Sequence, residues 1–281
     1  MSDAFQTMYR DEFIASFEVH QSLLRDLVTT EATIKGNQAV FLVSGSGGAT
    51  AVTRGVNGEI PARADSNTQT TATLREWHDL VRKTDFNVFA SQGNQRAIMQ
   101  MTTMAVINRK IDEEIYTLLN TGTVTLGSST TIPNVSLFQN AIVKLANADV
   151  SWDSNISFVC QPSFLAYLEQ TTEFTNAQYV DVRPYAGDTA SWRDKPMAYK
   201  WRGTLLLAHP SLPGNGTSSE KSFLFHKASI GHCANTAGIQ TPVGYNDEQA
   251  YSWARASIDM GGAVLQNSGI INITTDGSQY A

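Results

Sequence analysis

The sequence has few cysteines and no long apolar run. Its 281 residues include only two cysteines, Cys160 and Cys233, which lie far apart and outside any Cys-x-x-Cys motif. We expect both to be free, buried thiols in a reducing compartment. The chain has no run of 18 apolar residues and no signal-peptide pattern at its N-terminus, which argues against a membrane-spanning helix and a secretory leader. These absences predict a soluble chain made in the cytoplasm.

Charged residues are also scarce. They make up 16% of the chain, with a net charge of −6, whereas about 25% is usual for globular domains. No stretch concentrates Lys and Arg, so a surface that grips nucleic-acid phosphates is not expected. The hydrophobic fraction of 42% still indicates a globular core. We interpret the low charge as a sign that neighbouring copies cover much of the surface.

Motifs for catalysis and for cofactor binding are missing. The Gly-rich stretch 44–50 lacks the Lys and Ser/Thr of a phosphate-binding loop. His226, His232 and Cys233 lie close in sequence but match no zinc-ligand spacing. No Gly-x-Ser-x-Gly motif places a serine on a sharp turn. We therefore expect no catalytic, metal-binding or cofactor-binding residues and no enzymatic activity. An α+β enzyme with an unrecognised site is the alternative from a different class.

The strongest positive signal is one long amphipathic helix over residues 94–119. Apolar residues recur at three- and four-residue steps along it, and no Pro or Gly interrupts the pattern. The stripe consists of Ile98, Met101, Ala105, Ile111, Ile115 and Leu118. Charged residues fill the opposite face, among them Arg109 and Asp112, which we predict to contact a neighbouring subunit. A helix of this length needs a large apolar partner.

Residues 29–73 predict an extended loop. A short strand at 39–43 is followed by a Gly-rich segment, and the chain returns through a strand at 71–80. Loops of this length inside a compact domain are usually functional or bound to a partner. Four charged residues of the loop are candidate intersubunit contacts: Arg54, Glu59, Arg63 and Asp65.

The remaining segments alternate between helix and strand. We expect an arm helix, a polar linker, a helix, two buried strands, and a closing β meander that packs on the long helix. Ser163 is expected to cap a short helix, and the pair Gly261-Gly262 is expected to mark a bend in the meander. In the order just given, the expected ranges are 5–28, 123–131, 136–148, 156–160, 205–208 and 238–275.

This order of elements resembles the major capsid proteins of tailed bacteriophages, which have the Hong Kong 97-type fold. The resemblance rests on four segments: the arm FQTMYRDEFIASFEVHQSLLRDLV, the loop 29–73, the spine RAIMQMTTMAVINRKIDEEIYTLLN and the tail 238–275. The resemblance implies an α+β fold with an N-terminal arm (1–30), an extended loop (31–75), a peripheral domain with the spine helix (76–122 and 236–281) and an axial domain (123–235).

The resemblance also implies a function. Such a chain forms pentamers and hexamers and then an icosahedral head that encloses phage DNA without reading its sequence. Its expected partners are many copies of itself and, beyond these, scaffolding, portal and decoration proteins, with no membrane and no cofactor. It would be found in the virion after synthesis in the host cytoplasm. An encapsulin-type compartment shell shares this fold and is the alternative function.

Overall fold

The computed structural model describes residues 22–30, 33–90, 94–175, 183–184, 198–235 and 238–280. Five α-helices lie in these ranges: α1 (Asp85–Ala90), α2 (Gln95–Asn120), α3 (Val135–Asn147), α4 (Pro162–Glu169) and α5 (Thr172–Thr175). Short 3₁₀ turns occur at Arg25–Leu27, Lys227–Ser229, Asn267–Gly269 and Ser278–Tyr280. None of the helices in these ranges is both long and apolar enough to span a membrane.

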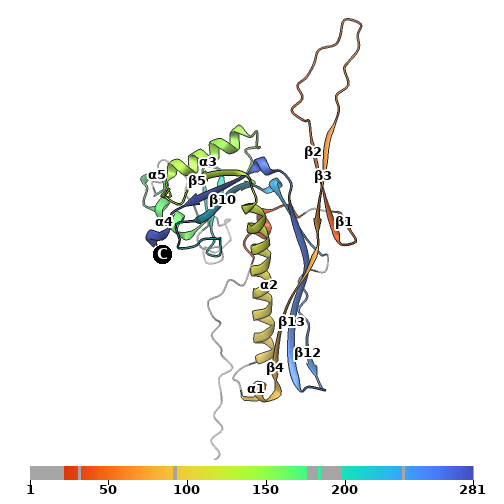
Figure 1. The fold of residues 1–281 in the computed structure, drawn as a ribbon, viewed down its shortest axis with the longest axis vertical. Coiled ribbons are helices and arrows are strands. Elements are labelled where there is room, and N and C mark those ends of the chain that lie inside the picture. Colours follow the sequence, from red (N-terminus) through yellow and green to blue (C-terminus); the bar gives the residue numbers. More distant parts are fainter. Residues whose placement is uncertain are drawn as a thin grey trace, which may run out of the picture. The chain divides into compact units, whose positions relative to one another are not determined.

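The strands of the described residues form three sheets, so the fold is α+β (Figure 1). The strands are β1 (Thr33–Lys35), β2 (Gln38–Gly45), β3 (Ser66–Thr73), β4 (Arg75–Thr84), β5 (Val124–Gly127), β6 (Ile156–Cys160), β7 (Arg183–Pro184), β8 (Ala198–Trp201), β9 (Thr204–Ala208), β10 (Glu220–His226), β11 (Ile230–Ala234), β12 (Val243–Asn246), β13 (Tyr251–Val264) and β14 (Ile270–Thr275).

The chain divides into two compact units. The first comprises residues 1–26, 75–116 and 234–260, and the second comprises residues 27–74, 117–233 and 261–281. The division falls inside α2 and inside β13, so both elements belong partly to each unit.

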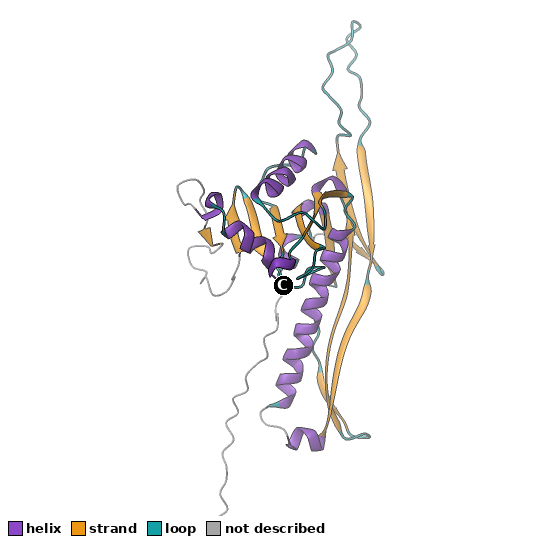
Figure 2. Ribbon diagram, turned by 60° about the vertical axis from the view of Figure 1, so that its left-hand side comes forward, coloured by secondary structure: helices purple, strands orange, loops and turns teal. Residues whose placement is uncertain are grey.

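In the first unit, α2 lies along the long antiparallel pair β4–β13 (Figure 2). The pair is in register from Arg75 opposite Met260 to Thr84 opposite Tyr251, and β12 adds a third strand. Arg96 of α2 donates to Ser252 Oγ over 3.2 Å. The buried face of β13 carries small residues such as Ala254 and Ala256, which leave room for a helix. The predicted long helix is confirmed, and its 26 residues span about 39 Å.

The second unit contains a seven-stranded sheet in the order β5-β14-β10-β6-β9-β8-β7. The helices α3 and α4 cover one face of this sheet through a core that includes Phe138, Phe164, Phe158 and Leu224. The ring of Phe138 stacks on Trp201 at a centroid distance of 4.8 Å. Asn134 caps α3 by accepting the Leu137 amide at 2.7 Å, which satisfies one of the free donors at a helix start.

Several strand predictions were wrong in their connections. The return expected as one strand at 71–80 is two strands in different sheets, because β3 pairs with β2 and β4 pairs with β13. The expected linker 123–131 contains β5, which pairs in parallel with β14. The last strand of the expected meander, β14, also pairs with β10 instead of β13. These connections depend on which distant strands pair with each other, and local residue patterns do not indicate that pairing.

Two local predictions were also wrong, and a third, the arm helix, lies largely outside the described residues. Ser163 lies inside α4 and its hydroxyl donates to the buried Glu220, while Gln161 takes the N-cap position. β13 continues through Gly261, where a side chain would meet the Thr73 carbonyl, so this glycine serves close backbone contact and not a bend. The predicted arm helix 5–28 lies outside the described residues up to position 21, and the described part, residues 22–28, holds only a 3₁₀ turn at Arg25–Leu27.

Candidate functional site

The most exposed part of the described chain is the hairpin of β2 and β3. These strands pair without a bulge from Gln38 opposite Thr73 to Gly45 opposite Ser66. The loop 46–65 continues beyond the strand ends as an open segment (Figure 1), and every one of its residues is exposed. A backbone bond from the Gly55 amide to the Glu59 carbonyl, 3.0 Å long, closes a turn within the loop.

Apolar side chains of this hairpin lie in solvent. The exposed fractions are 71% for Leu42, 63% for Val52, 106% for Val56 and 71% for Ile60. An isolated two-stranded hairpin gains little stability in water, and exposed apolar surface of this kind marks an interaction site. Only the charged residues of the loop were predicted as contacts from the sequence. The missed signal is the recurrence of apolar residues at every fourth position, at Val52, Val56 and Ile60.

The four predicted contact residues of the loop are all exposed. Arg63 and Asp65 form an ion pair with each other at 3.5 Å, and Asn67 donates to Asp65 at 3.3 Å. Arg54 and Glu59 lie on either side of the turn at Gly55, with their side chains in solvent. An exposed pair such as Arg63–Asp65 contributes little to the stability of a single chain. The charges of the loop are therefore available to a second molecule.

The base of the hairpin, in contrast, is packed. Ala39, Phe41 and Ala72 are buried together with Cys233, and Leu74, Ala263 and Leu265 pack around them. A Cβ atom at Gly231 would lie 2.6 Å from the Phe41 ring, so the absent side chain makes room for the aromatic ring. The fold thus holds the base of the hairpin firmly and leaves its tip free.

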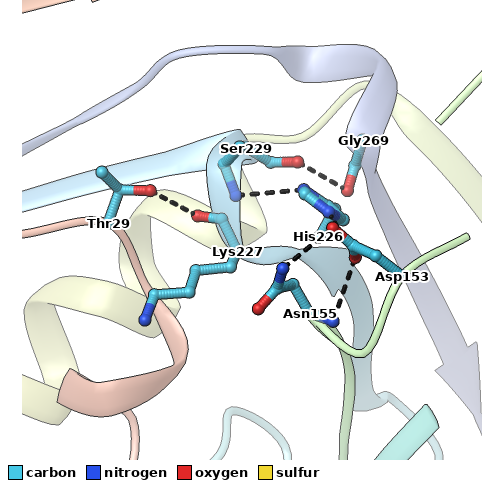
Figure 3. Close-up of polar contacts among 8 residues, drawn as sticks. Thr29, Asp153, Asn155, His226, Lys227, Ser229 and Gly269 are labelled. Atoms are coloured by element: carbon cyan, nitrogen blue, oxygen red, sulfur yellow. Dashed lines mark hydrogen bonds and ion pairs between the residues drawn. The ribbon is translucent and has the colours of Figure 1, made fainter. Parts of the chain in front are cut away.

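The chain that precedes the hairpin is fixed at Thr29. Its amide donates to the Ile230 carbonyl at 3.0 Å, and its own carbonyl accepts the His232 amide at 2.9 Å. Its hydroxyl donates to the Lys227 carbonyl at 3.0 Å (Figure 3). These bonds add Thr29 to β11 as an isolated parallel bridge with Gly231. The N-terminal segment therefore leaves the second unit from a defined point.

Asp112 of α2 holds residues 22–24 within the first unit. The carboxylate accepts the Ser22 hydroxyl at 2.6 Å and the amides of Leu23 and Leu24 at 3.1 Å each. Asp112 is only 2% exposed and Leu24 is fully buried. The Asp112 carboxylate therefore binds the chain's own N-terminal segment, and the intersubunit contact expected of it stays a prediction.

Arg109 is exposed on α2, and its charge acts on Asp79 of β4 within the same unit. Burial raises the pKa of Asp79, while the Leu80 amide and the Arg109 charge oppose that rise. At the next residue, burial would lower the pKa of Lys110, but hydrogen bonds and charges from Glu113 and Glu114 outweigh this effect and raise the pKa. These charges of α2 thus interact within the chain.

Of the histidine and cysteine residues noted in the sequence, His226 has its ring held by two neighbours. His226 Nε2 lies 2.9 Å from Asp153 Oδ1, and its Nδ1 accepts the Ala228 amide at 3.1 Å, so both ring nitrogens are occupied (Figure 3). Hydrogen bonds from Asn155 lower the pKa of Asp153, and His226 adds to this effect. Within the part of the chain that the structure describes, no three His, Cys, Asp or Glu residues are grouped to hold a metal ion.

Comparisons with known proteins agree with this arrangement. The family described as "Phage capsid protein" matches residues 1–276. The fold is similar to that of a structure from Mycobacterium phage Che8, with a TM-score of 0.71, 17% identity, and coverage of 97% of this chain and 98% of the other. No curated protein sequence matches the chain.

Two further structures share the fold. The capsid of Ralstonia phage GP4 has a TM-score of 0.73 at 10% identity and covers 98% of this chain and 96% of its own. The head structure of Helicobacter pylori bacteriophage KHP40 has a TM-score of 0.71 at 10% identity, with 95% and 94% covered. The predicted Hong Kong 97-type fold is thereby confirmed.

Proposed function

The chain belongs to the phage capsid protein family and is a major capsid protein of an icosahedral head shell, and we propose that its β2–β3 hairpin ties neighbouring copies together. The observation that supports this most is the contrast within the hairpin, whose base is buried around Phe41 while Val52, Val56 and Ile60 lie in solvent. Burying these three side chains on a neighbour contributes about 1.5–3 kcal/mol each.

The charged residues of the loop give this contact its specificity. Arg54 and Glu59 lie between the apolar residues of the tip, on either side of Val56, and Arg63 and Asp65 follow on the returning side. Charges at the rim of an interface steer partners and exclude wrong registers more than they add affinity. The four side chains therefore fix where on the neighbouring copy the apolar tip settles.

We assign the predicted domains to the shell as follows. Residues 76–122 and 236–260 form the peripheral domain around the spine helix α2, and residues 123–235 form the axial domain. The resemblance assigns the segment 261–281 to the peripheral domain. We place it instead with the axial domain, since β14 pairs with β10 and β5. Residues 1–30 act as the arm that reaches a neighbour, and Asp112 and Thr29 fix its origin.

The shell encloses DNA without reading its sequence. The net charge of −6 and the absence of a basic cluster support an inner surface with no strong grip on phosphates. Pentamers and hexamers of the chain itself are its main partners, with portal, scaffolding and decoration proteins beside them. The protein is synthesised in the host cytoplasm and resides in the virion.

The family match favours a phage head over an encapsulin-type compartment. The matched family is described as "Phage capsid protein", and the match covers residues 1–276. A structural role also accounts for the exposed apolar hairpin, because exposed apolar surface marks an interaction site. The chain acts by assembling, without catalysing a reaction.

Negative-stain imaging and size-exclusion chromatography of the purified chain test the function. We expect rings, tubes or shells in at least one assembly buffer. A chain that remains a 30.6 kDa monomer in all of them contradicts the proposal.

A hairpin variant tests the proposed contact separately. Replacing residues 46–65 by Asn-Gly joins Gly45 to Ser66 through a two-residue turn and keeps the register of β2 and β3. The variant should fold and stay unassembled. The double substitution Val56→Asp/Ile60→Asp should act in the same way, whereas Val56→Leu/Ile60→Leu, which keeps the apolar surface, should assemble.

A further inference from the structure

A second surface, on the first unit, carries its acidic and its basic residues at opposite ends. Side chains alternate along β4, so that Glu76, His78, Leu80 and Arg82 share one face of the sheet. Directly opposed residues of an antiparallel pair lie on the same face. On β13 these are Asp259 opposite Glu76, Ser257 opposite His78, Arg255 opposite Leu80 and Trp253 opposite Arg82. The alternate residues of β13, from Ser252 to Met260, are the buried ones, so the face with the charges is the outer one.

The outer face has an acidic end and a basic end. Glu76 and Asp259 form the acidic end as directly opposed neighbours, and Arg82 and Arg255 form the basic end around Leu80 and Trp253. Arg82 lies six positions after Glu76, which is about 20 Å along a strand. The screening length at physiological salt is about 8 Å. The two ends therefore do not neutralise each other within one chain.

At neither end do opposite charges among the described residues fully neutralise the charge. Two carboxylates directly opposed on a sheet destabilise it. Glu76 lies 3.0 Å from His78, which is charged only when protonated, and Asp259 accepts the Asn235 amide side chain at 3.1 Å. Arg82 stacks over the Tyr251 ring at 5.1 Å. Neither Arg82 nor Arg255 takes part in an ion pair of the described residues.

We propose that this face is a two-fold contact between copies, in which the acidic end of each subunit meets the basic end of the other. The inference rests on the proposed function, which supplies many copies of the chain. It differs from the hairpin contact because it uses other residues in the other unit. A contact in which one surface meets its own copy is isologous, and it pairs the two subunits about a two-fold axis. Leu80, 44% exposed, and the half-buried Trp253 provide the apolar centre that such a contact needs.

Charge reversal on one strand tests the proposal. Glu76→Arg and Arg82→Glu each place like charges together across the contact, and such juxtaposition costs several kcal/mol. Sedimentation velocity at about 0.15 M salt should show the assembled fraction reduced at least tenfold in each single variant. The double variant Glu76→Arg/Arg82→Glu restores opposite charges between copies and should recover assembly to within about threefold of the wild type.

The control is Lys200→Glu, an exposed position of β8 in the other unit with the same change of net charge as Arg82→Glu. It should assemble like the wild type. No variant should unfold at a clearly lower temperature than the wild type, because Glu76 and Arg82 are exposed, and Glu76→Arg also removes the repulsion from Asp259.

Single variants that assemble normally, or a double variant no better than the singles, overturn the contact and leave the function of the shell intact. Singles that fail because they unfold early also overturn it. A wild-type chain that never assembles overturns the proposed function instead.

Discussion

At the scale of single residues, Asp112 shows how one side chain organises a terminus. Its carboxylate collects one hydroxyl and two backbone amides, and hydrogen bonds to a charged group contribute about 1.5–3 kcal/mol. We expect Asp112→Ala to release residues 22–24 and to speed tryptic cleavage after Arg25 at least tenfold. The neighbouring Glu113→Gln should leave the cleavage rate unchanged. Equal rates in both variants would show that Asp112 does not hold the segment.

A pH dependence follows from Asp153. Its pKa is lowered by the Asn155 side chain and by His226. A carboxylate with a lowered pKa in the folded state stabilises the protein above its unfolded pKa, and this contribution disappears as the pH falls through the folded value. The wild type should therefore lose more stability below pH 3.8 than Asp153→Asn does, as measured by urea unfolding. Parallel losses in both proteins would contradict this.

Both cysteines should be unreactive in the folded chain. Cys160 is fully buried and Cys233 is 4% exposed, and burial raises the pKa of each thiol. Because the thiolate is the reactive form, a thiol reagent at pH 7.5 should label neither residue until the protein is unfolded. Rapid labelling of either cysteine in the native protein would mean that its surroundings open readily.

At the scale of elements, the hairpin depends on a glycine at its base. Gly231→Ala puts a Cβ atom 2.6 Å from the Phe41 ring, and overpacking of this kind costs about 1–3 kcal/mol. Chemical denaturation should show that loss, and adding Phe41→Leu should recover part of it. If the two substitutions simply add, the ring and the glycine are not in contact.

Secondary structure was largely readable from the sequence, whereas strand pairing was not. The stripe from Ile98 to Leu118 predicted α2, and the apolar run at 156–160 predicted β6, because both patterns are local. The break at Leu74 and the parallel pairing of β5 with β14 depend on partners far along the chain. The charges of the candidate site were identified, but the burial of Asp112 was not, since its partners lie 88–90 positions away.

At the scale of the whole molecule, two exposed surfaces have complementary roles. The hairpin carries apolar side chains on a free tip, and the outer face of β4 and β13 carries separated charges. Raising the salt concentration weakens the charged contact and strengthens apolar burial. We therefore expect assembly of the wild type to be more sensitive to salt than assembly of the double variant Arg82→Gln/Arg255→Gln, measured by light scattering between about 0.05 and 0.5 M NaCl.

We propose that copies of this chain join into a shell through the hairpin. Negative-stain imaging of the wild type beside the variant in which Asn-Gly replaces residues 46–65 tests it most directly. Rings or shells from the wild type, and a folded but unassembled variant, are the predicted result. Shells of normal size and yield from the shortened hairpin would contradict the account.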